Sequence, residues 1–497
     1  MKTLRVILLL ACVLAFSFLA RAEEPPQMRA LLIGCDHFLS QADTAPAAEN
    51  NIALLARVLL RDSRGYQVVR TLPNALSSEE EMAQAVRETF SGAEENDISL
   101  LYISTHGVYQ EQPGSAEAAL LLSDGIREGL LTASVLEDML DQVPGTKVLI
   151  LDACHSGAFI GKGISAPGGT PLFNGEKYKV LCSAGGSEAS WYWQGSGVVP
   201  GGASHFATVL SDALGAHGPC AADSNADGRV TLAEVYAYLC ENYAASTPQV
   251  YPQREEAFTL FCYDPENVPE AKGAVTDITF SDTLLPAGQR EVAFAFTVRK
   301  PSKLYYQLVY HEDGQWQFGT AQHFLDAEQP DGLTLPGRKA RTLCLDTGRE
   351  DMYGYAMLQF ISVEPEGPAL QGSRLLCVPP ASGEISLSVV TDAAFRPGMG
   401  REAAVWVRHD KPCGMTVSVV NNRGQTVCYL ACDTPSRPQQ LTPAASTFYW
   451  DGKDNRGRDC APGQYKVQVK VTIGENTYSA ESAGFLLLPV LSGATAP

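Results

Sequence analysis

Three short, continuous runs of apolar residues constrain the fold of this chain more than any other feature of its sequence. They are residues 98–104 (ISLLYIS), 147–151 (KVLIL) and 179–183 (KVLCS). Such unbroken runs are typical of strands that are buried on both faces, as in a parallel sheet between helices. Strand-like runs at 29–34 and 66–72 alternate with helix-like spacing at 52–59 and 78–90. The first half of the chain therefore predicts an α/β domain with about six strands.

The sequence changes character after Tyr263. The segment 264–269 (DPENVP) reads as a linker, and the residues that follow are β-rich with few convincing helices. A second linker is expected at 378–383 (VPPASG). Each later segment has the size of a β-sandwich. We therefore expect an α/β domain at 23–265 and two all-β immunoglobulin-like sandwiches at 266–380 and 381–497.

The first 22 residues read as a signal peptide. Lys2 and Arg5 precede the apolar stretch 6–20, and Ala20-Arg21-Ala22 has the small-x-small pattern of a cleavage site. The apolar stretch is short for a membrane anchor. Because it continues past Cys12, a lipoprotein site at that cysteine is disfavoured. We expect a secreted or cell-surface protein with no membrane span in the mature chain.

The net charge of −19 bears on the partners of the protein. An acidic surface argues against nucleic acid and against anionic membranes as partners. Protein or peptide substrates remain compatible with it.

Two of the predicted buried strands end in residues with catalytic chemistry. The run 98–104 leads into His106, and the run 147–151 leads into Cys154. In an open parallel sheet, sites assemble beyond the carboxyl ends of the strands, so both side chains are expected at one edge. A cysteine attacks as its thiolate, and His106 could act as the base that deprotonates it. Gly107 would let the backbone approach a substrate carbonyl, and its N–H together with that of Cys154 could stabilise an oxyanion.

The motifs Ser104-Thr105-His106-Gly107 and Asp152-Ala153-Cys154-His155-Ser156-Gly157 together resemble the caspase-like superfamily of cysteine peptidases, in particular its metacaspase-type members. The resemblance covers about residues 28–262. It implies a caspase-haemoglobinase fold, a Cys-His dyad at Cys154 and His106, and a specificity pocket that includes Asp152 and Ser104. The implied activity is endopeptidase cleavage after Arg or Lys, because a carboxylate binds a guanidinium group bidentately.

One position departs from the family pattern. Metacaspase-type members carry an Asn-Asp pair at the start of the first helix, and its Asp is a second pocket acid. The corresponding residues here are Glu49-Asn50-Asn51, which leaves open whether Asn51 or Glu49 occupies the pocket position. The Q-A-C motif of the aspartate-specific caspases is missing before the nucleophile, so no preference for Asp is expected.

Several alternatives accompany this interpretation. A lone cysteine or histidine is usually structural, and a zinc site at His106, Cys154 and His155 lacks a fourth ligand. A legumain-like or clostripain-like peptidase would differ mainly in its specificity pocket. A non-catalytic cell-surface binding protein would use the sandwiches and keep the α/β domain as a scaffold.

A second motif fits the EF-hand loop pattern at every defining position. The expected Ca²⁺ ligands are Asp223, Asn225, Asp227, the carbonyl of Arg229, Thr231 and Glu234. Gly228 permits the sharp turn of such a loop. Since the sequence contains no second loop to pair with it, we expect a solitary structural Ca²⁺ site, with a simple Asp/Asn turn as the alternative.

Three further segments carry weaker signals. The glycine-rich segment 158–177 follows the nucleophile and is either a plain loop or a maturation site cut after Lys162 or Lys177. The aromatic residues 191–193 either wall the substrate cleft or pack under a loop. Residues 450–465 resemble the immunoglobulin-like repeat of the flagellar hook-cap protein family, and Trp450 and Tyr465 are expected to be core or corner residues.

Overall fold

The structure is a computed structural model that describes residues 26–489 apart from gaps, the longest of which are 164–171, 194–201, 268–274, 324–331, 345–353 and 437–445. The predicted signal peptide lies outside the described residues. Among the described helices, none has the length and apolar character that crossing a bilayer requires.

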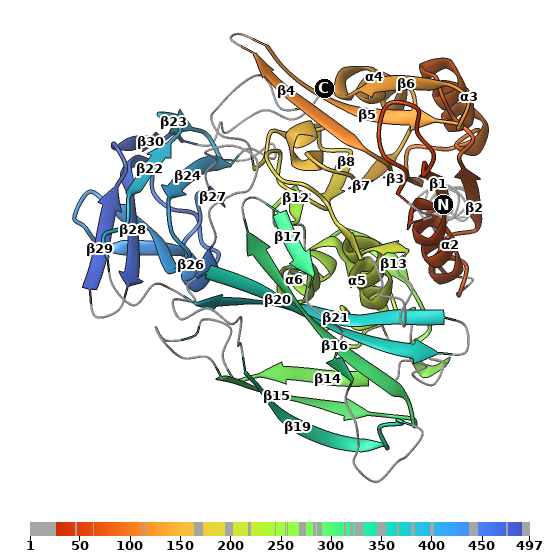
Figure 1. Ribbon diagram of the computed structural model, residues 1–497. Coiled ribbons are helices and arrows are strands. Elements are labelled where there is room, and N and C mark those ends of the chain that lie inside the picture. Colours follow the sequence, from red (N-terminus) through yellow and green to blue (C-terminus); the bar gives the residue numbers. More distant parts are fainter. Residues whose placement is uncertain are drawn as a thin grey trace, which may run out of the picture.

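A six-stranded sheet organises the first part of the chain, in the order β12-β8-β7-β3-β1-β2 (Figure 1). Its strands are β1 Met28–Gly34, β2 Val68–Pro73, β3 Ile98–Ser104, β7 Thr146–Asp152, β8 Tyr178–Cys182 and β12 Gln249–Tyr251. All neighbours pair in parallel except β12, which is antiparallel to β8. The three apolar runs form β3 and β7, which are the two central strands, and β8, which lies next to β7. The predicted parallel α/β arrangement is therefore confirmed.

In the described part of the chain, five helices cover the two faces of this sheet: α2 Ala47–Leu59, α3 Glu79–Thr89, α4 Ala133–Asp141, α5 His205–Ala213 and α6 Leu232–Asn242. Alternate residues of one strand enter different cores, because side chains of a strand point to opposite faces. Tyr102 packs in a core with α2, α5 and α6, whereas Leu101 packs in a core with α3 and α4. Ser78 is the N-cap of α3, and its side-chain hydroxyl accepts a hydrogen bond from the N–H of Glu81.

Smaller elements surround the sheet. An antiparallel sheet of β4 Gly107–Gln112, β5 Ser115–Ser123 and β6 Glu128–Thr132 projects from the edge of the molecule, and the sequence analysis did not anticipate it (Figure 1). The remaining elements of this part are η1 Ser156–Ile160, β9 Tyr192–Trp193, β10 Ala203–Ser204, β11 Arg229–Thr231, β13 Thr259–Cys262 and η2 Pro265–Asn267.

The residues after this part form two β regions, each built from two sheets (Figure 1). The middle region contains β14 Val275–Phe280, β15 Glu291–Val298, β16 Lys303–Glu312, β17 Gln315–Phe318, β18 Gln322–His323, β19 Gly337–Cys344, β20 Gly354–Glu364 and β21 Gly367–Val378. The C-terminal region contains β22 Leu387–Thr391, β23 Ala394–Phe395, β24 Ala403–His409, β25 Cys413–Asn421, β26 Thr426–Ser436, β27 Ser446–Trp450, β28 Gly463–Ile473, β29 Asn476–Glu481 and β30 Phe485–Leu487.

Trp450 and Tyr465 lie in the core of the C-terminal β region. Trp450 is fully buried, and its ring lies 5.0 Å from that of Tyr465 between centroids. The indole N–H donates to the carbonyl of Lys453, which ties the aromatic ring to the turn that follows it. Of the two positions expected for these residues, core or corner, both occupy the core.

Candidate active site

The ends of β3 and β7 bring His106 and Cys154 to one place. Ser104 and Asp152 are paired residues in the parallel register of these strands, so the residues that follow them leave the sheet side by side. Both His106 and Cys154 line a single pocket. The other residues that line it are Cys35, Thr44, Ala47, Ala48, Asn51, Ser104, Thr105, Asp152, Ala153, Ser190, Trp191, Tyr192 and Ser204. Among the described residues, neither His106, Cys154 and His155 nor the carboxylates of the loop at 223–234 are arranged as a group of three or more side chains that could hold a metal ion.

Gly107 lies against the backbone of Cys154. A Cβ atom at position 107 would come within 1.9 Å of the Cys154 carbonyl oxygen, a separation that no side chain tolerates. Glycine is therefore required for the two peptide units to approach each other. This close approach places the backbone of Gly107 beside the candidate nucleophile, where the sequence analysis expected an oxyanion site.

The imidazole of His106 is held by a segment that precedes the first helix. The ring of Phe38 lies 4.5 Å from that of His106 between centroids, and Nε2 of His106 is 3.0 Å from the carbonyl oxygen of Ala42. A carbonyl only accepts hydrogen bonds, so Nε2 must carry the proton in this contact. In the neutral imidazole Nδ1 is then unprotonated, which makes it the nitrogen that can take a proton from a thiol.

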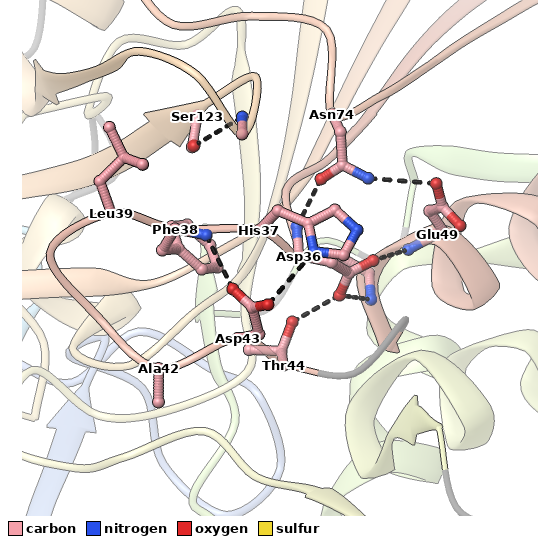
Figure 2. A network of polar contacts seen from close by, with 12 residues as sticks. Asp36, His37, Phe38, Leu39, Ala42, Asp43, Thr44, Glu49, Asn74 and Ser123 are labelled. Atoms are coloured by element: carbon pink, nitrogen blue, oxygen red, sulfur yellow. Dashed lines mark hydrogen bonds and ion pairs between the residues drawn. The ribbon is translucent and has the colours of Figure 1, made fainter.

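Asp36 fixes the segment that holds His106. Its carboxylate accepts hydrogen bonds from the N–H groups of Ala48 and Glu49 at 2.7 and 2.8 Å and from the Thr44 hydroxyl (Figure 2). These two N–H groups lie at the start of α2, where backbone donors lack partners within the helix. The fully buried Asp36 thereby ties the segment to the helix.

Asp43 closes the tip of the same segment by accepting from the N–H of Phe38 at 2.9 Å (Figure 2). No sequence pattern predicted that the segment 36–44 contributes to the site. Its two aspartates, spaced as turn-forming residues before a helix, were the available signal.

The thiol of Cys154 is partly buried and donates to the carbonyl of Ser190 at 3.7 Å. Burial raises the pKa of the Cys154 thiol above its ordinary value, and the nearby carboxylate of Asp152 raises it further, although the hydrogen bond to Ser190 acts in the opposite direction. In this arrangement the thiol is therefore protonated at neutral pH.

This protonation state predicts how Cys154 responds to alkylation. We expect the rate of reaction with iodoacetamide in the free protein to keep rising with pH through about 8.5, the ordinary pKa of a thiol, because only the thiolate reacts. The measurement is mass-spectrometric labelling of Cys154 across pH, with the exposed Cys432 as an internal reference. A plateau at or below neutral pH would contradict the expectation and indicate a thiolate paired with a charged His106.

Asp152 forms the polar end of the pocket. It is only 4% exposed, and its carboxylate accepts from the hydroxyls of Tyr102 at 2.9 Å, Ser190 at 3.1 Å and Ser204. Burial raises the pKa of this carboxyl, and the hydrogen bonds from these hydroxyls partly offset the effect. The hydroxyl donors were not predicted, because they come from segments distant in sequence.

Of the two candidates for the second pocket position, Asn51 lies in the pocket. It is buried, and its Nδ2 lies 3.0 Å from the hydroxyl of Ser104 and 3.5 Å from Oδ2 of Asp152. Glu49 is exposed and accepts from the side chain of Asn74 instead. The pocket lining therefore contains one carboxylate, that of Asp152, and the neutral amide of Asn51.

His155 adopts a left-handed backbone conformation with φ of 60°, which is uncommon for a residue other than glycine. Its Nδ1 lies 2.9 Å from the carbonyl of Gly186, and its N–H donates to the carbonyl of Glu188. The side chain of Glu188 in turn accepts from Thr247, so this loop is tied to the following segment. His155 thus faces the loop at 185–190.

The loop at 223–234 has the turn that the EF-hand pattern requires. Gly228 has φ of +80°, and its N–H donates to Oδ2 of Asp223 at 3.0 Å. Glu234 reaches back to the N–H of Ser224 and also forms a capping box with Thr231 at the start of α6. Asn225 and Asp227 contact each other at 3.1 Å, and Arg229 extends into β11. The side-chain oxygens are thus all of the kind that Ca²⁺ prefers, within one loop.

A model of a known protein family matches the part of the chain that contains this pocket. Residues 27–268 match the family model described as "Caspase domain". This part of the chain therefore has a caspase-like α/β fold with a mixed, mostly parallel sheet, and members of the family are cysteine peptidases. No curated protein matches the chain.

Three solved structures illustrate the likeness. A Geobacter sulfurreducens protein is 14% identical, with 48% of this chain and 100% of that chain covered and a TM-score of 0.34. Caspase-1 from Spodoptera frugiperda is 17% identical, with 46% and 90% covered and a TM-score of 0.30. The structure titled pro-sf-caspase-1 is 14% identical, with 46% and 96% covered and a TM-score of 0.29.

Proposed function

We propose that the protein is a secreted cysteine endopeptidase that uses Cys154 as nucleophile and His106 as base, and that cleaves after Arg or Lys. The observation that carries the proposal is the pocket that His106 and Cys154 share with the buried carboxylate of Asp152. The caspase-domain match supports cysteine peptidase chemistry for residues 27–268.

The proposed reaction begins with proton transfer from the Cys154 thiol to Nδ1 of His106. The thiolate attacks the carbonyl carbon of the scissile peptide, and the N–H groups of Gly107 and Cys154 stabilise the resulting oxyanion. His106 then donates its proton to the leaving amine, which breaks the C–N bond and leaves a thioester on Cys154. Water, deprotonated by His106, hydrolyses the thioester and regenerates the thiol.

The proposed preference for Arg or Lys rests on the pocket chemistry. A cationic side chain that reaches Asp152 would meet a carboxylate already oriented by three hydroxyls. Oδ1 of Asp152 accepts from Ser190, while Oδ2 accepts from Tyr102 and Ser204. A bound cation would also stabilise the charged form of the carboxyl, whose pKa burial raises.

The test of this function is cleavage of fluorogenic peptides that end in Arg, Lys, Asn or Asp. Cleavage after Arg or Lys supports the proposal, whereas cleavage after Asn favours a legumain-like peptidase. Absence of cleavage, even after limited proteolysis to release a zymogen, would support the non-catalytic binding protein instead.

We further propose that the two β regions are immunoglobulin-like sandwiches that place the enzyme on a surface or cover its cleft before activation, and that residues 1–22 direct its export. N-terminal sequencing of the protein recovered from a culture supernatant tests the export signal. A chain that begins at Glu23 supports it, and an intracellular chain that keeps Met1 contradicts it.

We also propose a structural Ca²⁺ ion in the loop at 223–234. Asp223, Asn225, Asp227, the carbonyl of Arg229, Thr231 and Glu234 would hold it, with the carboxylates released from their present backbone partners.

Terbium luminescence can detect occupancy of this loop. The hydroxyl of Tyr263 lies 2.7 Å from Oδ2 of Asp223, so a lanthanide bound there should emit when Tyr263 absorbs. We expect Tyr-sensitised Tb³⁺ emission that Ca²⁺ displaces, that Tyr263→Phe strongly reduces, and that Asp223→Asn abolishes. Emission equal in the wild type and in Asp223→Asn would contradict the site and leave an Asp/Asn turn.

A further inference from the structure

Lys162 is a buried cation next to the candidate active site. It is 5% exposed, and it follows η1, the short helix after Cys154. Its Nζ donates to the carbonyl of Val250 at 2.7 Å, to Oε1 of Gln253 at 2.9 Å and to Oε2 of Glu402 at 3.1 Å. The ammonium group also lies 4.0 Å from the centroid of the Tyr449 ring, within the range of a cation–π contact. Because Lys162 is buried and its ammonium group has three hydrogen-bond acceptors, the structure does not favour a maturation cut after Lys162, one of the two alternatives for the segment 158–177.

Two of these partners belong to the C-terminal β region. Glu402 precedes β24 and Tyr449 lies on β27, and the two strands are neighbours in one sheet, with Ala404 paired to Tyr449. The hydroxyl of Tyr449 also accepts from the N–H of Gly163 at 3.3 Å. Glu402 and Tyr449 of the C-terminal region therefore contact two consecutive residues, Lys162 and Gly163, of the loop that follows the candidate nucleophile.

Lys162 and Gly163 are in turn hydrogen-bonded to the loop at 185–190, which contacts Cys154. The N–H of Gly186 donates to the carbonyl of Lys162 at 2.9 Å, and the N–H of Ser187 donates to the carbonyl of Gly163 at 2.8 Å. Gly163 has φ of +66°, and a Cβ atom there would lie 2.5 Å from Cα of Gly185. The two loops are thus in direct backbone contact, without room for a side chain between them.

The last residue of the loop at 185–190 contacts the thiol of Cys154. The carbonyl of Gly186 contacts His155, and the carbonyl of Ser190 accepts from the Cys154 thiol. A continuous series of contacts consequently joins Glu402 and Tyr449 to Lys162 and Gly163, then to Gly186 and Ser187, and finally to Cys154.

A buried ion pair is a costly way to join two domains. Desolvation of both charges offsets much of their attraction, while loss of one partner leaves an uncompensated buried charge. Burial lowers the pKa of Lys162, and Glu402 opposes this effect. Such a pair therefore favours one docking geometry strongly over others, which suits a role in positioning.

We propose that Lys162, Glu402 and Tyr449 form an interdomain clamp, in which the C-terminal β region holds the loop at 185–190 in place against Cys154. The three are positioning residues, and the C-terminal region is part of the catalytic unit. The effect on catalysis rests on the proposed peptidase function, whereas the effect on loop order and on the Cys154 thiol does not.

The experiment uses Glu402→Gln and Tyr449→Phe in the full chain. Hydrogen exchange of the Gly186 and Ser187 amides and iodoacetamide labelling of Cys154 are measured, and neither needs a peptide substrate. For Glu402→Gln we expect exchange of both amides to accelerate about tenfold or more and labelling of Cys154 to accelerate, because its contact with Ser190 loosens. Tyr449→Phe, which keeps the ring but loses the bond to Gly163, should show a smaller change of the same sign.

Glu255→Gln is the matched control. Its partner Lys179 lies at 2.6 Å and the pair is half-buried, but both residues belong to the first part of the chain. This variant should leave the two amides and the thiol at wild-type rates. The amides of β3 serve as an internal reference for global destabilisation.

Wild-type rates for Gly186, Ser187 and Cys154 in Glu402→Gln would overturn the proposal, and so would acceleration that β3 shares equally. If the wild type cleaves peptides, kcat in Glu402→Gln should fall about 10- to 100-fold with KM little changed, as for a displaced reacting group. The charge-free double variant Lys162→Met with Glu402→Gln should regain thermal stability without regaining kcat. If thermal stability and kcat recovered together, the three residues would act on catalysis only by stabilising the fold, and the proposed positioning role would be wrong.

Discussion

Replacing Cys154 by alanine is expected to lower kcat/KM for peptide cleavage by on the order of 10⁴-fold or more. The thiolate is the only group in the proposed reaction that forms a covalent bond to the substrate, and alanine supplies no substitute for it. Peptide binding should persist, because the variant keeps the carboxylate of Asp152 that is proposed to bind the cationic side chain. The measurement is kcat/KM with an Arg-terminated fluorogenic peptide together with its affinity for the variant.

The control for this loss is Cys432→Ala. Cys432 is an exposed thiol on β26 of the C-terminal region, so its removal changes the same chemistry at a distant place. His106→Ala should approach the loss seen for Cys154→Ala, because the two side chains act as one unit. Activity in Cys154→Ala close to that of the wild type would refute the assigned nucleophile.

Replacing Asp152 by asparagine is expected to lower kcat/KM for Arg-terminated peptides by about 10²- to 10³-fold, the loss that follows when a buried cation is left without its partner. Asparagine keeps the shape of the side chain. Its single carbonyl oxygen can still accept from Tyr102 and Ser204, and its NH2 group can donate to the hydroxyl of Ser190, which now accepts, so the pocket should keep its geometry. The effect should fall mainly on the cationic substrates, and the ratio of Arg to Asn cleavage is the quantity to measure.

Glu49→Gln is the matched control for the loss of one negative charge. Glu49 is exposed at the start of α2 and bonds to Asn74 rather than to the pocket. It should leave the ratio of Arg to Asn cleavage unchanged. An unchanged ratio in Asp152→Asn as well would mean that another group sets the residue preference.

Much of the fold follows from local patterns in the sequence. The runs at 98–104 and 147–151 are almost entirely apolar, which is typical of strands buried on both faces, and β3 and β7 are such strands. The antiparallel sheet of β4 to β6 escaped prediction although its strands pair with their neighbours in sequence, because β4 carries the polar residues Gln110, Glu111 and Gln112. The position of β12 beside β8 was unpredictable because it joins segments that are distant in sequence.

The candidate site divides in the same way. The sequence by itself determined that His106 and Cys154 follow parallel strands and therefore meet at one edge, and that Gly107 is compatible with close backbone approach. Only the tertiary structure decided that Asn51 rather than Glu49 enters the pocket, because this depends on which face of α2 packs on the sheet. It also decided the loop contacts, namely Ala42 on His106, Ser190 on Cys154 and the burial of Lys162 against Glu402. The residues of a run themselves indicate that it forms a buried strand. A loop, by contrast, takes its conformation from partners up to 240 residues away, and no local pattern reveals these partners.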